Sequence, residues 1–301
     1  EKLSVSDFST AEEVVKGLKE KNSENIKHIN FNKRKKIVIT TKKWQHFKVS
    51  LVIIAIATGS VFTYGVATNK YNFNIEYIKN TEITAHRGDS LNYPENTLLA
   101  FTSALDKNAD WIELDIQLTS DKKVVVSHDA NLKRVAGVDK NIYDLTYDQL
   151  HEINLNNIDD SNKEVKVPLL SDVFIWGLVN NIKFNVEIKP YYEDRLLVEN
   201  TIKLIKKYHL EDRVVLTSSK YNVLEEVKEI DNKITTGYIM SFAYGDILKL
   251  DKADNFSIET SSISKELVKN LHNNGKEVYA WTVNNKDSIN KMLDLNVDNI
   301  I

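Results

Sequence analysis

Two histidines and two carboxylates within a short stretch of the chain are the side chains most suited to chemistry. His86 and His128 each follow an apolar, β-branched run, which predicts that both lie at strand ends. Between them, Glu113 and Asp115 stand two residues apart in the run WIELDIQL, so both side chains point to one face of a predicted strand. Burying two like charges together is costly unless a cation or a shared proton compensates. This pattern favours a metal site.

A later run, NVEIKP, adds a third carboxylate. Glu187 and Lys189 share one face of this predicted strand with Asn185, while the alternating apolar residues face the other way. Three carboxylates favour a hard divalent cation, Ca²⁺ or Mg²⁺, over zinc. The chain has no cysteine, which excludes disulfides and thiolate chemistry.

The elements that position these side chains follow an alternating βα pattern from residue 81 onward, which predicts an α/β fold with a mainly parallel sheet. The number of predicted parallel strands is the number that a closed (β/α)8 TIM barrel requires. The strands are predicted at residues 82–86, 111–117, 183–188, 213–218, 234–239, 255–259, 277–283 and 297–301. The helices are predicted at residues 95–107, 169–180, 193–209, 221–230, 264–274 and 286–295, with a short one at 241–250. A doubly wound open sheet is the main rival, but no Gly-rich phosphate loop follows any strand.

The run that ends in His128 departs from this pattern. Only the segment TSDKK separates Leu118 from Val124, whereas a parallel crossover needs a dozen residues or more. The run must therefore return antiparallel, as a hairpin, which makes the predicted barrel irregular. Such a hairpin brings His128 back to the edge of the sheet where the two carboxylates project. In barrels the carboxyl ends of the strands form the active-site face.

The chain before the barrel divides into three segments. Residues 1–48 are polar and end in a basic cluster, residues 49–68 carry no charge, and residues 69–80 form a linker to the barrel at 81–301. The apolar run is long enough for a helix to cross about 30 Å of hydrocarbon, so a transmembrane helix is expected. A buried core helix or the apolar part of a signal peptide are the alternatives.

Positive charge before this apolar run predicts the orientation in a cell membrane. The positive-inside rule places the N-terminus in the cytoplasm and the barrel outside the cell, and the basic segment is expected to attract anionic lipid of the bilayer. The net charge of −3 gives no general attraction to nucleic acid, so no nucleic-acid partner is expected. The abrupt start and end of the sequence suggest a fragment, and the barrel is expected to be truncated at its C-terminus.

Five runs together resemble the glycerophosphodiester phosphodiesterase family. They are AHRGDSLNYPENTLLAF, WIELDIQLTSD, VVVSHDANLKR, NVEIKP and VYAWTVN, and the resemblance covers residues 82–301. It implies an irregular TIM barrel related to phosphatidylinositol phospholipases C. It also implies hydrolysis of glycerophosphodiesters, or of other phosphoglycerol-containing substrates, to glycerol 3-phosphate and an alcohol with one divalent cation.

The resemblance also implies a role for each candidate residue. Glu113, Asp115 and Glu187 are the implied metal ligands, and His86 and His128 are the implied acid and base pair. Implied substrate contacts come from three further residues. Arg87 and Lys189 hold the phosphate, and Trp281 packs against the glycerol.

Several points stay open at the level of sequence. Either histidine fits either proton-transfer role, and the nucleophile is water or a glycerol hydroxyl of the substrate, the latter through a cyclic phosphate. Asp89, Glu95, Asn96 and Asp129 flank the site as hydrogen-bonding groups, although helix capping explains Glu95 and Asn96 equally well. Hydrolysis of lipids of the lysophospholipase D type and a noncatalytic module that binds phosphoglycerol polymers are the alternative functions.

Overall fold

The computed structural model describes residues 81–156, 164–189 and 194–301. The predicted membrane-spanning segment 49–68, together with segments 1–48 and 69–80, lies outside these described residues. Among the helices of the described ranges, none combines the length and apolar character that a membrane crossing requires.

Eight parallel strands form a closed barrel, as the sequence predicts. Their order around the barrel is β1, β2, β4, β5, β6, β7, β8 and β9, and β9 pairs with β1 to complete the ring. The strands span Glu82–Ala85 (β1), Trp111–Leu118 (β2), Lys183–Ile188 (β4), Val214–Ser218 (β5), Thr235–Met240 (β6), Asn255–Glu259 (β7), Glu277–Trp281 (β8) and Asn299–Ile300 (β9). Each predicted parallel strand is confirmed, and the open-sheet alternative is wrong.

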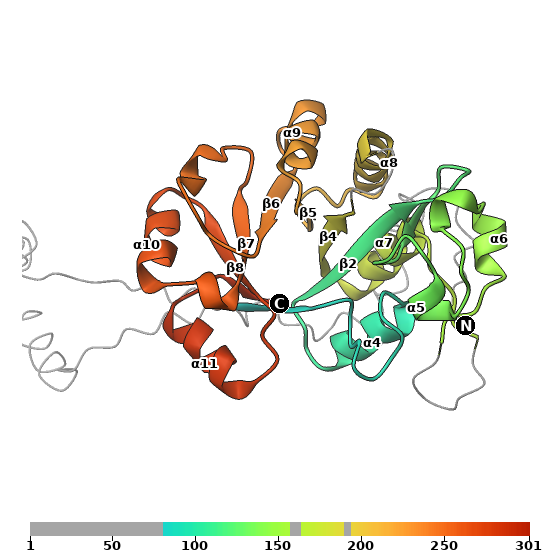
Figure 1. Cartoon of the computed structure of the whole chain (residues 1–301), viewed down its shortest axis with the longest axis horizontal. Coiled ribbons are helices and arrows are strands. Elements are labelled where there is room, and N and C mark those ends of the chain that lie inside the picture. The colour runs from blue at the N-terminus through green and yellow to red at the C-terminus, as the bar shows by residue number, and fades with distance from the viewer. Residues whose placement is uncertain (1–80, 157–163, 190–193) are drawn as a thin grey trace, which may run out of the picture. The chain divides into compact units, whose positions relative to one another are not determined.

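Helices surround the strands (Figure 1). They span Leu98–Asp106 (α4), Leu170–Asn180 (α7), Asp194–Lys207 (α8), Tyr221–Ile230 (α9), Lys265–Asn273 (α10) and Lys286–Asp294 (α11). These six predicted helices are confirmed. The helix predicted at 241–250 is wrong, because only the short 3-10 turn η4 (Ile247–Lys249) forms there. Gly245, in the left-handed conformation with φ of 78°, interrupts the segment.

Strand β2 shows how the barrel separates apolar from polar side chains. All of its residues are buried, and Ile112, Leu114 and Ile116 belong to a core cluster shared with residues of α7 and α8. Each such side chain contributes about 1.5–3 kcal/mol when it is fully buried. The alternate positions carry Glu113 and Asp115, which period-two geometry directs to the inside of the barrel.

The predicted hairpin is confirmed by strand β3 (Val124–Val126), which pairs antiparallel with β2. The turn is closed by a hydrogen bond from Thr119 N to Lys123 O (3.0 Å), and Lys122 adopts a left-handed φ of 63°.

Three short helical segments that the sequence did not predict follow this hairpin. They span Lys133–Ala136 (α5), Ile142–Asp144 (η3) and Tyr147–His151 (α6). They pack on a small apolar cluster of their own, in which Leu132 and Ile142 are fully buried. This cluster anchors the chain segment that follows His128.

Candidate active site

Three carboxylates meet at the carboxyl ends of two neighbouring strands. Glu113 and Asp115 extend from β2 and Glu187 from β4, and the register of the sheet pairs Asp115 directly with Glu187. One oxygen of each carboxylate lies within 4.8 Å of the others. Glu113 and Asp115 are buried, and the Glu187 side chain is 13% exposed. The structure therefore brings the three predicted metal ligands together.

Lys189 lies between two of these carboxylates. Its Nζ is 2.7 Å from Glu187 Oε1 and 3.1 Å from Asp115 Oδ1. Burial alone lowers the pKa of a lysine, but Asp115 and Glu187 outweigh this effect and raise the pKa of Lys189. The side chain is thus a permanent cation of the site.

Arg87 supplies a second cation from the turn after β1. Its backbone N donates to Glu113 Oε2 (2.8 Å), and its side-chain Nε is 3.3 Å from Asp115 Oδ2. The residue adopts a left-handed φ of 57°, which is uncommon outside glycine and typical of functional turns. Gly88 must follow it, because a Cβ there would lie 2.7 Å from the carbonyl carbon of Ala100.

Asn96 holds Asp115 from the other side. Its Nδ2 donates to Asp115 Oδ2 (2.9 Å), and its Oδ1 accepts from the Asp115 backbone N (3.2 Å). The capping alternative for Asn96 is wrong, because Thr97 is the N-cap of α4 and accepts from Ala100 N (3.3 Å). Asn96 is therefore a positioning residue for the central carboxylate.

His86 follows β1 directly, as predicted. Its Nε2 is 3.8 Å from Glu113 Oε2. Burial, followed by the charge of Arg87, lowers the pKa of His86 to about 4. The His86 side chain is 38% exposed, so solvent screens part of the effect of these neighbours on its pKa. The lowered pKa still favours a neutral imidazole.

His128 follows the hairpin strand β3. Its Nδ1 is 2.6 Å from Asp129 Oδ1, and its carbonyl accepts from Gln117 Nε2 (3.1 Å) on β2. Arg134 in turn donates to Asp129 Oδ2 from Nε (2.5 Å). Sequence reasoning gave Arg134 no role, although it lies in one of the runs that carry the family resemblance. The only available signal was its spacing of six residues from His128.

Trp281 and Asp89 occupy different places relative to this cluster. Trp281 ends β8 at the same edge of the barrel, half-buried, and its indole Nε1 donates to Ser257 O (2.9 Å). Asp89 instead accepts from Ser103 and Lys107 of the α4 region and ties the turn after β1 to that helix. Asp89 is thus a structural residue of the loop.

The three carboxylates differ in their electrostatics. Burial, together with Asp115 and Glu187, raises the pKa of Glu113 well above its usual range. Burial and Asp115 likewise raise the pKa of Glu187 to about 7. Burial also opposes ionisation of Asp115, but Lys189 and Arg87 outweigh it and lower the pKa of this carboxyl. Without a further cation, Glu113 and Glu187 are therefore harder to ionise than carboxyls in water.

These residues fit a divalent cation. The donor atoms are all carboxylate oxygens, which Ca²⁺ and Mg²⁺ prefer. Asp115 Oδ1 is fully buried and makes no directed hydrogen bond, because its contact with Lys189 is an ion pair without hydrogen-bond geometry. A buried carboxylate oxygen without a hydrogen-bond donor is suited to a metal ligand.

Comparison with known sequences identifies the family. Residues 86–301 match the glycerophosphoryl diester phosphodiesterase family. The chain belongs to this family. It is accordingly an enzyme, a phosphoric diester hydrolase. A protein named glycerophosphodiester phosphodiesterase from Caldanaerobacter subterraneus subsp. tengcongensis is 32% identical over 233 residues, which cover 73% of this chain and 93% of that protein.

Two further similarities extend the family assignment. The structure of a glycerophosphodiester phosphodiesterase from Thermotoga maritima superposes on this chain with a TM-score of 0.61 at 27% identity. The aligned region covers 74% of this chain and 94% of the Thermotoga maritima chain. The human lysophospholipase D GDPD1 is 36% identical over 150 residues, which cover 47% of this chain and 46% of that protein. The family and the barrel agree with the resemblance seen in the sequence.

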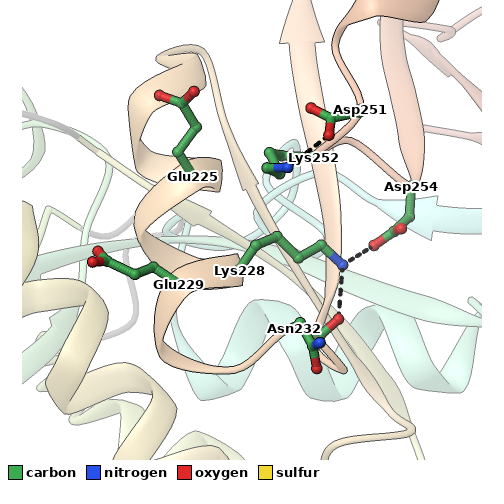
Figure 2. A pocket seen from close by; sticks show the side chains of 7 residues that line it. All are labelled: Glu225, Lys228, Glu229, Asn232, Asp251, Lys252 and Asp254. Atoms are coloured by element: carbon green, nitrogen blue, oxygen red, sulfur yellow. Dashed lines mark hydrogen bonds and ion pairs between the residues drawn. The ribbon is translucent and has the colours of Figure 1, made fainter.

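A surface pocket elsewhere on the barrel is lined by charged and amide side chains (Figure 2). It is lined by Glu225, Lys228, Glu229, Asn232, Asp251, Lys252 and Asp254. Lys228 Nζ donates to Asp254 Oδ2 (2.6 Å) and to the Asn232 carbonyl (3.4 Å), so its charge is already paired. Asn232 and Asp254 precede β6 and β7, which places this pocket at the edge opposite the family's active site.

The raised pKa of Glu187 makes the stability of the cation-free protein depend on pH. Below pH 4.5 the Glu187 carboxyl is protonated in both the folded and the unfolded state, so it does not change the free energy of unfolding. Between about pH 4.5 and 7 the unfolded state loses the proton while the folded state keeps it, so the free energy of unfolding falls by about 3 kcal/mol from Glu187. Thermal unfolding in excess chelator measures this slope.

Glu187→Gln is the matched control for this measurement, because it keeps the shape of the side chain and removes the titration. We expect the melting temperature of the variant to exceed that of the wild type increasingly as the pH rises through this window. Parallel profiles for the two proteins would show that Glu187 titrates normally.

Proposed function

We propose that the chain hydrolyses glycerophosphodiesters to glycerol 3-phosphate and an alcohol, using one divalent cation and a pair of histidines. The observation that carries the proposal is the convergence of Glu113, Asp115 and Glu187 with two permanent cations at the carboxyl end of the barrel. The named relative that matches over 93% of its own length supports the choice of substrate.

Glu113, Asp115 and Glu187 hold the cation in this proposal, and Ca²⁺ and Mg²⁺ both suit their oxygen donors. When bound, the cation neutralises charge on the nonbridging oxygens of the phosphodiester. Lys189 and Arg87 lower the pKa of Asp115, whereas the pKa values of Glu113 and Glu187 are raised, so these two carboxyls would release protons when a cation binds.

Arg87 and Lys189 bind the phosphate in the proposed reaction. Both side chains are charged and largely buried, with exposed fractions of 19% and 12%, so their fields are little screened at the site. Trp281 offers the apolar face of its ring to the glycerol carbons, and its bond to Ser257 O fixes the indole.

The two histidines divide the proton transfers. His86, whose pKa is lowered by burial and by Arg87, stays neutral and takes the proton from the attacking hydroxyl, of water or of the substrate glycerol. His128 is held by the Asp129 carboxylate, which orients its ring, and in this proposal it is the proton donor to the leaving alkoxide. One water is consumed overall, and one phosphoester bond breaks.

A second candidate substrate is a lysophospholipid. The similarity to human lysophospholipase D GDPD1 favours it, and so does the predicted attachment of the barrel to a membrane. The third hypothesis, a noncatalytic module that binds phosphoglycerol polymers, predicts binding without product release. Parallel assays with glycerophosphocholine and lysophosphatidylcholine separate the three, because only the enzyme readings release product.

We also propose that residues 49–68 anchor the barrel to the outer side of the cell membrane. The support is the uncharged run itself and the basic residues before it. Protease added to intact cells is expected to degrade the barrel and to leave residues 1–48 protected. Protection of the barrel together with digestion of residues 1–48 would show the opposite orientation and contradict the proposal.

Release of glycerol 3-phosphate from glycerophosphocholine by the full chain tests the proposed chemistry. We expect release with Ca²⁺ or Mg²⁺ and none in excess chelator. His86→Ala and His128→Ala each remove a proton-transfer group and are expected to lower kcat by about 10²- to 10⁴-fold without unfolding the protein. His151→Ala, an exposed histidine on α6, is the matched control and retains the wild-type rate. Full activity in either site variant would refute the acid and base assignment.

A further inference from the structure

Arg134 connects the two halves of the candidate site through two carboxylates. Its guanidinium donates from both terminal nitrogens to Glu95, from Nη2 to Oε1 (2.6 Å) and from Nη1 to Oε2 (2.9 Å). Its Nε donates to Asp129 Oδ2 (2.5 Å). The planar guanidinium of Arg134 thus binds the Glu95 and Asp129 carboxylates at the same time.

The Asp129 side of this bridge ends at a catalytic histidine. The second oxygen of Asp129, Oδ1, lies 2.6 Å from His128 Nδ1. A carboxylate at this distance fixes the orientation of the ring and favours the form with a proton on Nδ1. Because Arg134 holds the other oxygen, the carboxylate cannot rotate freely about its side-chain bonds.

The Glu95 side of the bridge ends at the phosphate-binding arginine. Glu95 Oε1 accepts from Arg87 Nη1 (3.1 Å) as well as from Arg134. Arg87 then reaches Asp115 through its Nε (3.3 Å). Burial opposes ionisation of Glu95, but Arg134 and Arg87 outweigh it and lower the pKa of this carboxyl. Glu95 therefore stays charged between the two arginines.

The position of Arg134 is itself fixed by the segment that follows the hairpin. Its helix α5 is short, but Leu132 before it is fully buried in the apolar cluster around Ile142. Asn131 accepts from Lys133 N (2.9 Å) and donates to Asn141 (3.0 Å), which closes the loop around the helix. The guanidinium is accordingly presented by a rigid part of the chain, although half of its side chain is exposed.

The geometry of this bridge fixes orientation in addition to adding ion pairs. A single exposed ion pair stabilises a protein little, whereas a bidentate arginine–carboxylate pair also fixes the relative orientation of the two groups. The bridge leads from the surface to two groups that, in the proposed function, act on the phosphate and on the leaving oxygen of one substrate. Its geometry matches a requirement for fixed spacing between the phosphate-binding group and the proton donor.

We propose that Arg134 is a positioning residue that holds the His128 imidazole and the Arg87 guanidinium in register. It acts through Asp129 on the first and through Glu95 on the second. The inference rests on the proposed function for the roles of His128 and Arg87. It predicts that the two sides of the bridge affect different kinetic constants.

Three variants of the full chain test this division with glycerophosphocholine as substrate. Asp129→Asn is expected to lower kcat by about 10- to 100-fold with KM unchanged within about twofold, because only the histidine side is lost. Glu95→Gln is expected to raise KM by about tenfold with a smaller change in kcat. Arg134→Gln is expected to show both effects, and Arg134→Lys to recover little, since a single ammonium cannot replace the fork.

Lys133→Gln is the matched control. It removes one positive charge from the same helix, at a side chain that is 74% exposed and lies 3.8 Å from Asp139, and we expect wild-type kinetics. Kinetics of Arg134→Gln that equal those of Lys133→Gln would overturn the inference. Changes of kcat that only follow the loss of thermal stability of each variant would also overturn it.

Nuclear magnetic resonance of the full chain with ¹⁵N-labelled histidine tests the bridge independently of turnover. We expect a hydrogen-bonded Nδ1 proton signal from His128, assigned by its loss in His128→Ala, that Lys133→Gln retains and Arg134→Gln loses or shifts. A signal unchanged in Arg134→Gln contradicts the positioning role. If the wild type shows this signal but releases no glycerol 3-phosphate, the proposed function fails while the bridge stands.

Discussion

Three carboxylates on two hydrogen-bonded strands set the electrostatic condition that the rest of the site must satisfy. The register that pairs Asp115 with Glu187 also brings Glu113 close, so like charges are forced together in a largely buried space. Lys189 and Arg87 compensate part of this charge and keep the central carboxylate ionised. The pKa values of Glu113 and Glu187 are raised instead, which favours the protonated forms of these two carboxyls while no cation is bound.

The chain meets this condition by combining a regular barrel with an irregular segment. The barrel supplies the carboxylates and Lys189 from strand ends, whose positions follow from the sheet. Arg87 comes from a left-handed turn, and His128 comes from the end of a hairpin. Arg134 links these two irregular parts through Asp129 and Glu95. Arg87 and His128, which the sheet does not position directly, are thus connected by hydrogen-bonded ion pairs. We propose that catalysis depends on the spacing between them.

Much of this arrangement was predictable from the sequence, for physical reasons. Apolar runs separated by helical patterns predicted the eight strands, and a period of two placed Glu113, Asp115 and Glu187 on inner faces. The short turn after Leu118 predicted the hairpin. A hydrogen-bonding role for Asn96 was one of two alternatives at the level of sequence. Its partner, Asp115, was not predictable, because the contact depends on a left-handed φ of 60° that no local pattern requires. Arg134 was missed because its place depends on a small tertiary core rather than on periodicity.

We propose that the three carboxylates bind one divalent cation in exchange for protons. Calorimetric titration of the chelator-treated full chain with Ca²⁺ and with Mg²⁺, at about pH 6.5 in two buffers of different ionisation enthalpy, measures binding and proton release together. We expect one cation per chain with release of protons, and we expect Glu113→Gln to lose both. Saturable binding that releases no protons, or binding that Glu113→Gln leaves unchanged, would contradict it.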